Sequence, residues 1–500
     1  MQENTNKAIA YNSVILYAKM LINTACALLS TRFALQALGV VDFGLYTVLG
    51  GVISLISIFN TIMLSSSNRF IAVALGKCNV KLVNEQFNVV LVIHIAIALF
   101  VLLISYPVGE FYIPRYVNYD GPLSNAMMVY YVSIVGCAIS FISVPYNALL
   151  MAKENFIVFS LVEVVSHVVK LIVSWLLLYY FIQKLLIYTV TMAVMTALPT
   201  IIFYFYCNRH YHNMIMFRFV RNKGMYISVF KFSAWVSVGA VAHIGKLQGA
   251  ALVVNTFFDT VMNTAMGVAS SISTYVNLFA NNVIQPMQPQ ITKSYVAHDT
   301  KRTDELLIMS TKYSFLLTFI IGSVFLIEPE WLIGIWLGEV PPYASIFLVL
   351  FVVDQLVQSF NAGINNIIWA SGKIALYQIL TSALNIFAIV AGYFVLRGGA
   401  AAYYLLVTYI VFSFFRFFAI QYALHKTLHY DNRQIWIKSY LPSISVVLLF
   451  LPIFLLPSFI HPAIRLSISF IYLCFLEWFI GLTKIERQRL SGFMKAKIHL

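Results

Sequence analysis

Fourteen runs of about 20 mostly apolar residues follow one another along this chain, with only short connectors between them. A helix needs about 20 such residues to cross a hydrocarbon layer roughly 30 Å thick. The runs are centred near residues 24, 54, 95, 137, 169, 196, 242, 274, 318, 357, 386, 411, 447 and 472. The sequence therefore predicts an all-α, polytopic membrane protein with about 14 transmembrane helices.

The composition excludes an ordinary soluble protein. Of the 500 residues, 61% are hydrophobic and 10% are charged, whereas soluble domains have about 25% charged residues. The N-terminus has one lysine before its apolar run and no small-residue cleavage site, so it is expected to be a retained first span. All five cysteines fall in spans or beside their ends and are expected to be small buried hydrophobes.

The distribution of basic residues predicts the topology. If the spans alternate from a cytoplasmic N-terminus, 23 of the 32 lysines and arginines fall on the cytoplasmic side, four fall outside and five lie within spans. This asymmetry obeys the positive-inside rule and predicts that both termini are cytoplasmic. The net charge of +14 is explained by topology, so no nucleic-acid partner is expected.

The span order predicts two related halves. A cytoplasmic connector, 208–228, follows six spans and precedes eight. We expect an N-terminal six-helix bundle (1–207), a linker (208–228), a second six-helix bundle (229–424), and two additional helices with a basic tail (425–500). A shift of 220 residues relates Ser13 to Ser233, Glu85 to Glu305 and Lys153 to Lys373. Because six is even, the repeats have the same orientation, which implies a pseudo-two-fold axis along the membrane normal.

Charged residues inside spans mark the candidate site. In LVEVVSHVVKLIVSW, residues 161–175, Glu163, His167 and Lys170 share one helical face. An intramembrane charge costs about 2.5–3.5 kcal/mol on insertion scales, so these groups, with Lys246 and Asp354, are not expected to face lipid. Two interpretations remain open: the charges tie helices together, or they line a wet cavity.

Polar stripes on other spans favour the cavity. Four more spans each carry polar residues at spacings that place them on one helical face. In span 1 these are Asn12, Lys19, Asn23 and Ser30, and in span 7 they are His243 and Lys246. In span 8 they are Asn263, Ser270, Thr274, Asn277, Asn281 and Gln285, and in span 10 they are Asp354, Gln358, Asn361 and Asn365. A single stripe is typical of helix–helix contacts, but several stripes in both halves suggest a shared hydrophilic lumen. Arg32 lies nearly opposite the span 1 stripe.

Motifs for energy conversion and catalysis are missing from the sequence. The Gly-Lys pairs lack the remaining residues of a phosphate-binding loop, and no His-Glu-x-x-His or Cys-x-x-Cys motif occurs. We therefore expect no ATP hydrolysis, no metal site, no cofactor and no enzymatic activity. A membrane polysaccharide polymerase is disfavoured, because the longest outside connector, 110–125, is too short to fold as a domain.

Two stretches resemble a known family. LGVVDFGLYTVLGGVISLISIFN, followed by SSSNRFIAVALG, and MNTAMGVASSISTYVNLFANNVIQPMQPQITKSYVAHD (Met262 to Asp299) resemble bacterial polysaccharide flippases of the Wzx type, relatives of MATE exporters in the MOP superfamily. The resemblance implies two six-helix bundles in a V around a central cavity. It also implies a multi-pass protein of the bacterial inner membrane that flips an undecaprenyl-diphosphate-linked oligosaccharide to the periplasmic leaflet. Membrane lipids, a polysaccharide polymerase and a chain-length regulator are the expected partners.

Each candidate residue then has an expected role. The cations expected to bind the substrate are Lys170, Lys246, Lys19 and Arg32. The polar lining is expected to comprise Asn23, His243, Asn277, Asn281, Gln358, Asn361 and Asn365, and the candidates for ion or proton coupling are Glu163, His167 and Asp354. A lipid II flippase would also bind an anionic substrate through cations in its lumen, so this function remains an alternative. An ion-coupled MATE-type exporter is a further alternative, although it is expected to need a more acidic lumen.

Overall fold

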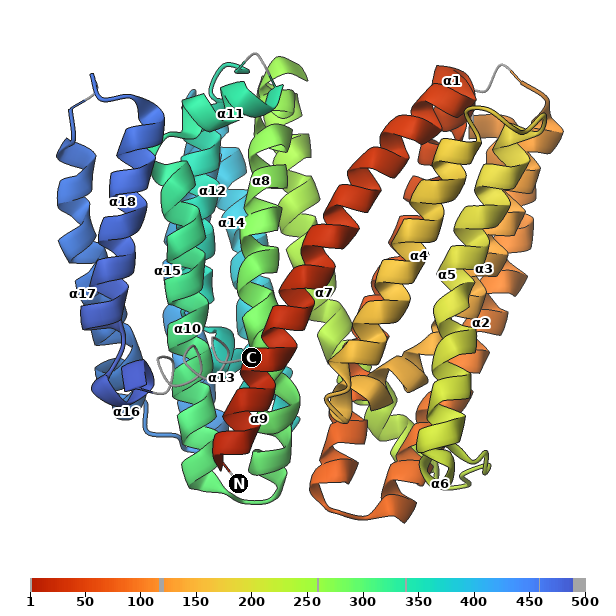
Figure 1. Ribbon diagram of the computed structural model, residues 1–500, viewed down its shortest axis with the longest axis horizontal. Coiled ribbons are helices and arrows are strands. Elements are labelled where there is room, and N and C mark those ends of the chain that lie inside the picture. The colour runs from red at the N-terminus through yellow and green to blue at the C-terminus, as the bar shows by residue number, and fades with distance from the viewer. Residues whose placement is uncertain (1, 117–120, 259, 338–339, 458, 489–500) are drawn as a thin grey trace, which may run out of the picture. The chain divides into compact units, whose positions relative to one another are not determined.

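The computed structural model describes residues 2–116, 121–258, 260–337, 340–457 and 459–488, and these residues contain helices and no strand (Figure 1). They form two compact units. The N-terminal unit is Tyr11–Ser237, and the C-terminal unit is Val238–Leu500 together with Met1–Ala10. The chain passes from one unit to the other inside two helices, α1 (Gln2–Gly76) and α7 (Lys223–Phe257).

The N-terminal unit is built from long helices with short connections. Its elements are α1 (Gln2–Gly76), α2 (Val80–Tyr116), α3 (Leu123–Ala152), α4 (Phe156–Leu176), α5 (Lys184–His210) and the short α6 (His212–Ile215). Asn155 begins α4, since its side chain accepts a hydrogen bond from the backbone N–H of Val158, as expected of an N-cap asparagine.

The C-terminal unit has more numerous and shorter elements. They are α7 (Lys223–Phe257), α8 (Thr260–Ile284), α9 (Met287–Val296), α10 (Thr300–Ile327), α11 (Pro329–Leu337), α12 (Ala344–Ser359), α13 (Ala362–Ser371), α14 (Ala375–Arg397), α15 (Tyr404–Leu428), α16 (Arg433–Ile435), α17 (Leu441–Phe450) and α18 (Pro462–Leu476). Asp299 caps α10 by accepting a hydrogen bond from the N–H of Arg302 at 3.0 Å.

The helices confirm a multi-pass, all-α architecture. Among the described residues, 11 helices are long and apolar enough to cross a membrane, or 12 if the bent pair α12 and α13 counts as one span. The other two predicted spans, near residues 54 and 274, are also helical: they lie in the second part of α1 and in α8. The many asparagine, serine and threonine residues of α8 explain its low hydropathy.

A glycine separates the first two predicted spans. Gly39 interrupts α1 with φ 76° and ψ 174°, a combination that is essentially restricted to glycine. The first span, Tyr11–Gly39, therefore ends where the backbone needs a residue without a Cβ atom.

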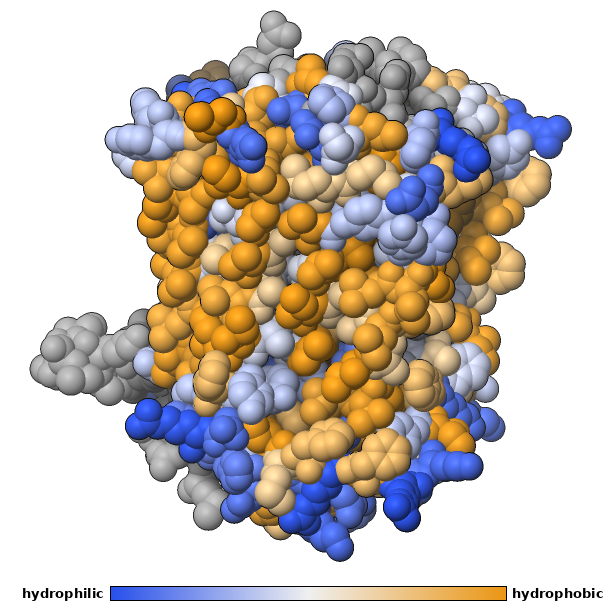
Figure 2. All heavy atoms as spheres, turned by 90° about the vertical axis from the view of Figure 1, so that its right-hand side faces the viewer, coloured by the Kyte–Doolittle hydropathy of each residue, from blue (hydrophilic) through white to orange (hydrophobic). Residues whose placement is uncertain are grey.

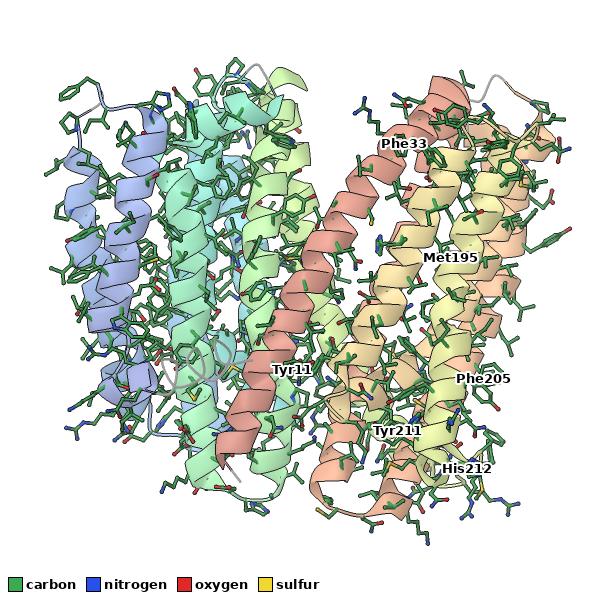
Figure 3. All side chains as sticks on the ribbon, in the orientation of Figure 1. Tyr11, Phe33, Met195, Phe205, Tyr211 and His212 are labelled. Carbon is green, nitrogen blue, oxygen red and sulfur yellow. The ribbon has the colours of Figure 1, made fainter. Side chains whose placement is uncertain are left out.

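The outer surface is that of a membrane protein. On the face that it presents, Figure 2 shows a broad apolar belt between two hydrophilic rims. Phe205 of α5 lies on the outside of the N-terminal unit (Figure 3) and is 65% exposed. Leu103 of α2 is 74% exposed. Soluble monomers rarely expose large contiguous apolar patches, so lipid is the natural solvent for this belt.

The predicted linker is short and fixed to α2. Between α6 and α7, residues 216–222 are not helical. Asn84 donates hydrogen bonds to the carbonyls of Met214 and Met216, and Asn88 donates to Met216 and accepts from the N–H of Arg218. Two buried amides thus replace the hydrogen bonds that a helix would have given this backbone.

Candidate polar sites within the two units

A buried ion pair anchors the polar cluster of the C-terminal unit. Lys246 of α7 lies with its Nζ 3.2 Å from Oδ2 of Asp354 on α12, and the two residues are 4% and 8% exposed. Ser413 of α15 donates to Oδ1 of the same carboxylate. Burial of two charges requires this kind of mutual compensation with further hydrogen bonds.

An arginine extends this cluster along α15. Gln358 donates to Asp354 Oδ2 at 2.8 Å, and Arg416 Nη1 donates to Gln358 Oε1 at 2.9 Å. Tyr409 holds Lys246 from another side, because its hydroxyl donates to the Lys246 carbonyl and its ring centroid lies 4.5 Å from Nζ. We call Lys246, Asp354, Gln358, Ser413 and Arg416 the C-terminal cluster.

A polar pocket of about 200 Å³ opens beside this cluster. Its lining comes from α8, α10, α12, α13 and α15: Asn277, Asn281, Ile284, Ser314, Gln355, Gln358, Ser359, Asn361, Ala362, Asn365, Asn366, Arg416 and Ile420. Five of the seven residues expected as polar lining are brought together here. Lys246 and Asp354 are not part of the lining, and Gln358 connects Asp354 to the pocket.

Several buried polar atoms of the pocket have no hydrogen-bond partner within the part of the chain that the structure describes. They are Oδ1 of Asn361, Oδ1 of Asn365, Nδ2 of Asn366 and Nε of Arg416. An unsatisfied buried donor or acceptor costs about 1–3 kcal/mol. The pocket is therefore suited to a ligand or waters with several hydrogen-bonding groups.

A break between α12 and α13 shapes the pocket. The sequence pattern predicted one continuous span there, but the two helices meet at 47° around residues 360 and 361. Ser359, Asn361 and Ala362 at this break all line the pocket. Gly363 makes the arrangement sterically possible, since a Cβ atom there would collide with the Leu307 carbonyl and the Thr311 side chain of α10.

A second polar cluster lies in the N-terminal unit between α1 and α4. Lys19 Nζ lies 2.9 Å from Glu163 Oε2 and 4.2 Å from the ring centroid of Phe159. The hydroxyls of Ser30 and Ser174 lie 2.8 Å apart and join the same two helices further along. The polar stripes of the two helices therefore face each other.

Lys170 is the second cation of this cluster. It is half-buried, as is His167 on the same face of α4, and among the described residues it forms no ion pair. Asn23, one turn from Lys19, is also half-buried, and its Oδ1 has no hydrogen-bond partner. We call Lys19, Asn23, Glu163, His167 and Lys170 the N-terminal cluster.

Two predicted site residues do not belong to the pocket lining. Arg32 and His243 are exposed, and neither lines the pocket. For Arg32, this agrees with its position opposite the span 1 stripe. Asn263 lies in α8, but its side chain is outside the described set. Within that set, no group of three or more His, Cys, Asp or Glu is arranged to hold a metal ion.

Arg416 is the functional candidate that sequence reasoning missed. It lies in VFSFFRFFAIQ, residues 411–421, where many phenylalanines surround the few polar residues, so that no polar stripe is evident from the sequence. Ser413 three residues before it was the available signal, since i and i+3 share a face. Asn366 was missed because it lies beside the Asn361–Asn365 stripe.

The fold matches solved membrane transporters. A MATE protein in its straight conformation aligns with a TM-score of 0.72 at 13% identity, covering 85% of this chain and 97% of its own. A MATE transporter of Vibrio cholerae gives 0.73 at 12% identity, covering 87% and 100%. A MOP superfamily transporter from Pyrococcus furiosus gives 0.67 at 12%, covering 85% and 97%.

No protein-family model matches the sequence, and no curated protein matches it. The likeness at these identities is one of fold. The chain is a multi-pass membrane protein with the fold of MATE-type members of the MOP superfamily.

Proposed function

We propose that this chain is a membrane transporter that flips an undecaprenyl-diphosphate-linked oligosaccharide from the cytoplasmic to the periplasmic leaflet of a bacterial inner membrane. One observation carries the proposal: each polar cluster holds two cations and one carboxylate. Lys19 pairs with Glu163 and leaves Lys170, while Lys246 pairs with Asp354 and leaves Arg416.

An excess of positive charge inside apolar helices favours an anionic substrate. Charges attract more strongly in a low-dielectric interior than in water, and phosphate is bound well by both lysine and arginine. In this proposal, Lys170 binds the diphosphate. Glu163 and His167, on the same face of α4, adjust the charge of Lys170 or relay a proton. The amides and hydroxyls around the pocket suit the sugar hydroxyls.

The fold is compatible with this charge pattern. The Pyrococcus furiosus structure is described as having a binding pocket of reverse polarity that suggests a different function. This description indicates that binding pockets of different polarity occur within this fold. An exporter of cationic drugs is the less favoured alternative, because the groups of both clusters that form no ion pair with any described residue, Lys170 and Arg416, are cations.

A lipid II-type flippase is the second candidate, since its substrate has the same diphosphate lipid. The resemblance of residues 38–76 and 262–299 to polysaccharide flippases favours the oligosaccharide. The distribution of basic loop residues supports cytoplasmic termini, and a polysaccharide polymerase with its chain-length regulator are the proposed partners.

Complementation tests the proposal. The chain is expressed in a bacterium that lacks its own polysaccharide flippase, and surface polysaccharide is measured for wild type, Lys170→Ala and Lys246→Ala. Lys81→Ala, at an exposed lysine of α2, is the matched control. We expect wild type and control to restore surface polysaccharide and Lys170→Ala to fail at equal membrane abundance.

The outcomes separate the candidates. Restoration by Lys170→Ala at the wild-type level would contradict the anionic-site mechanism. Restoration of a lipid II flippase mutant, with no effect on surface polysaccharide in several host strains, would favour the second candidate instead.

A further inference from the structure

The pocket lined by Arg416 combines one cation with five asparagine amides in a volume of about 200 Å³. From this combination, we infer that it is a binding site for a single sugar residue that carries a carboxylate. The inference rests on the proposed function and deepens it, since it states what kind of sugar the transported glycan contains.

The volume limits the ligand to one ring. Ligand pockets for drug-sized molecules are about 300–1,000 Å³, and this one is about 200 Å³. A whole oligosaccharide does not fit such a volume. A single pyranose does, with the remainder of the glycan outside the pocket.

The lining presents the groups that recognise sugar hydroxyls. Asparagine amides both donate and accept hydrogen bonds. The pocket is lined by Asn277 and Asn281 of α8, by Asn361 at the break between α12 and α13, and by Asn365 and Asn366 of α13. Asn361 is 2% exposed, and its Oδ1 is unpartnered. The orphaned atoms include acceptors on Asn361 and Asn365 and a donor on Asn366, so a ligand with hydroxyl groups satisfies both kinds.

The charge of the pocket is one positive unit. Arginine does not lose its proton in proteins, and among the described residues Arg416 has no ion-pair partner. The only carboxylate of the C-terminal cluster, Asp354, is already paired with Lys246. One net positive charge is matched by one monovalent carboxylate.

The shape of the guanidinium favours a carboxylate over a point anion. Arg416 uses Nη1 for Gln358, and its Nε is buried without a partner. Guanidinium groups bind planar carboxylates through paired N–H donors. A hexuronate combines this carboxylate with the ring hydroxyls that the asparagines require.

Equilibrium binding tests the inference on the purified full-length protein. The probes are radiolabelled D-glucuronate and D-glucose, measured at low ionic strength for wild type, Arg416→Gln and Arg416→Lys. Arg397→Gln, at an exposed arginine of α14 in the same unit, is the control. We expect saturable glucuronate binding, with glucose and the Arg416→Gln variant each about ten- to a hundredfold weaker. Arg416→Lys keeps the positive charge but lacks the paired N–H donors of the guanidinium, so its affinity for glucuronate should lie between those of wild type and Arg416→Gln.

Three results would overturn the inference. They are equal binding of glucose and glucuronate, undiminished glucuronate binding by a folded Arg416→Gln protein, and no saturable binding of either sugar. A fourth result, competition by acetate or inorganic phosphate as strong as that by glucuronate, would reduce the site to a general anion site and contradict the sugar assignment.

The binding assay needs no flipping, which keeps the two proposals distinguishable. Glucuronate binding without complementation would reject the proposed function alone. Complementation without glucuronate binding would reject this inference alone. Thermal unfolding of each variant shows whether it is folded when it is measured.

Discussion

Lys246 and Asp354 are 108 residues apart in sequence, and their side chains meet at 3.2 Å in the interior of the C-terminal unit. The pair joins α7 to α12, and through Ser413 it also joins α15. This carboxylate therefore connects three helices of the unit, and its removal has consequences for stability as well as for transport.

Asp354→Asn should destabilise the C-terminal unit. It leaves the Lys246 charge buried without a counter-charge, and breaking a buried pair in this way costs about 3–5 kcal/mol. Thermal unfolding in detergent measures the effect, with Glu330→Gln, at an exposed position, as the control. The double variant Lys246→Met/Asp354→Leu should recover most of the loss, and a double variant as unstable as Asp354→Asn would refute this explanation.

Glu163→Gln should cost less stability than Asp354→Asn. The Glu163 side chain is 35% exposed, and exposed pairs contribute about 0–1 kcal/mol because solvent screens them. The same unfolding measurement compares the two variants directly. An equal loss would indicate that the Lys19–Glu163 pair is as structural as the Lys246–Asp354 pair.

Gly363→Val should displace α13 and close the pocket. A side chain at this position meets the Leu307 carbonyl and Thr311 of α10, and overpacking of a tight contact costs about 1–3 kcal/mol. Gly267→Ala is the matched control, because nothing lies within 4 Å of a Cβ atom there. Unfolding temperature and glucuronate binding are measured together. Normal binding by Gly363→Val would show that this close approach does not form the pocket.

Gly39→Val should weaken the N-terminal unit. A valine in the positive-φ conformation of this break is strained by about 1–3 kcal/mol, although no atom obstructs its Cβ. Gly245→Ala, inside helix α7 and equally unobstructed, should instead be neutral or slightly stabilising. Equal unfolding temperatures for the two variants would contradict the role of the backbone conformation at Gly39.

The double variant Asn84→Ala/Asn88→Ala should expose the linker to protease. Both amides hold the backbone of residues 214–218, and local opening governs proteolysis. Limited trypsin digestion at Arg218 and Arg221 should become faster than in wild type. Asn222→Ala, in the same segment but exposed, is the control. An unchanged cleavage rate in the double variant would show that Asn84 and Asn88 do not hold the linker in place.

The helical membrane architecture could be predicted from the sequence because hydropathy is a local property of each segment. Fourteen apolar runs indicate helices wherever they occur. The polar faces of α4 and α8 were also predictable, since residues three and four apart share a face of any helix. Five asparagine and glutamine residues chosen in this way, from Asn277 to Asn365, do meet in one pocket.

Tertiary structure alone decided which charges are compensated. The sequence places Lys170 on the same helical face as Glu163, but in the described part of the chain the ion pair of Glu163 is formed with Lys19 on α1. The choice depends on distances between helices, and periodicity within one helix contains no such distances. For the same reason, the sequence could not predict that Lys246 forms a buried ion pair with Asp354 while Arg416 lines the pocket. The break at residues 360–361 was likewise hidden, because Gly363 alone does not distinguish a continuous span from a broken one and its close approach to α10 appears only in the tertiary structure.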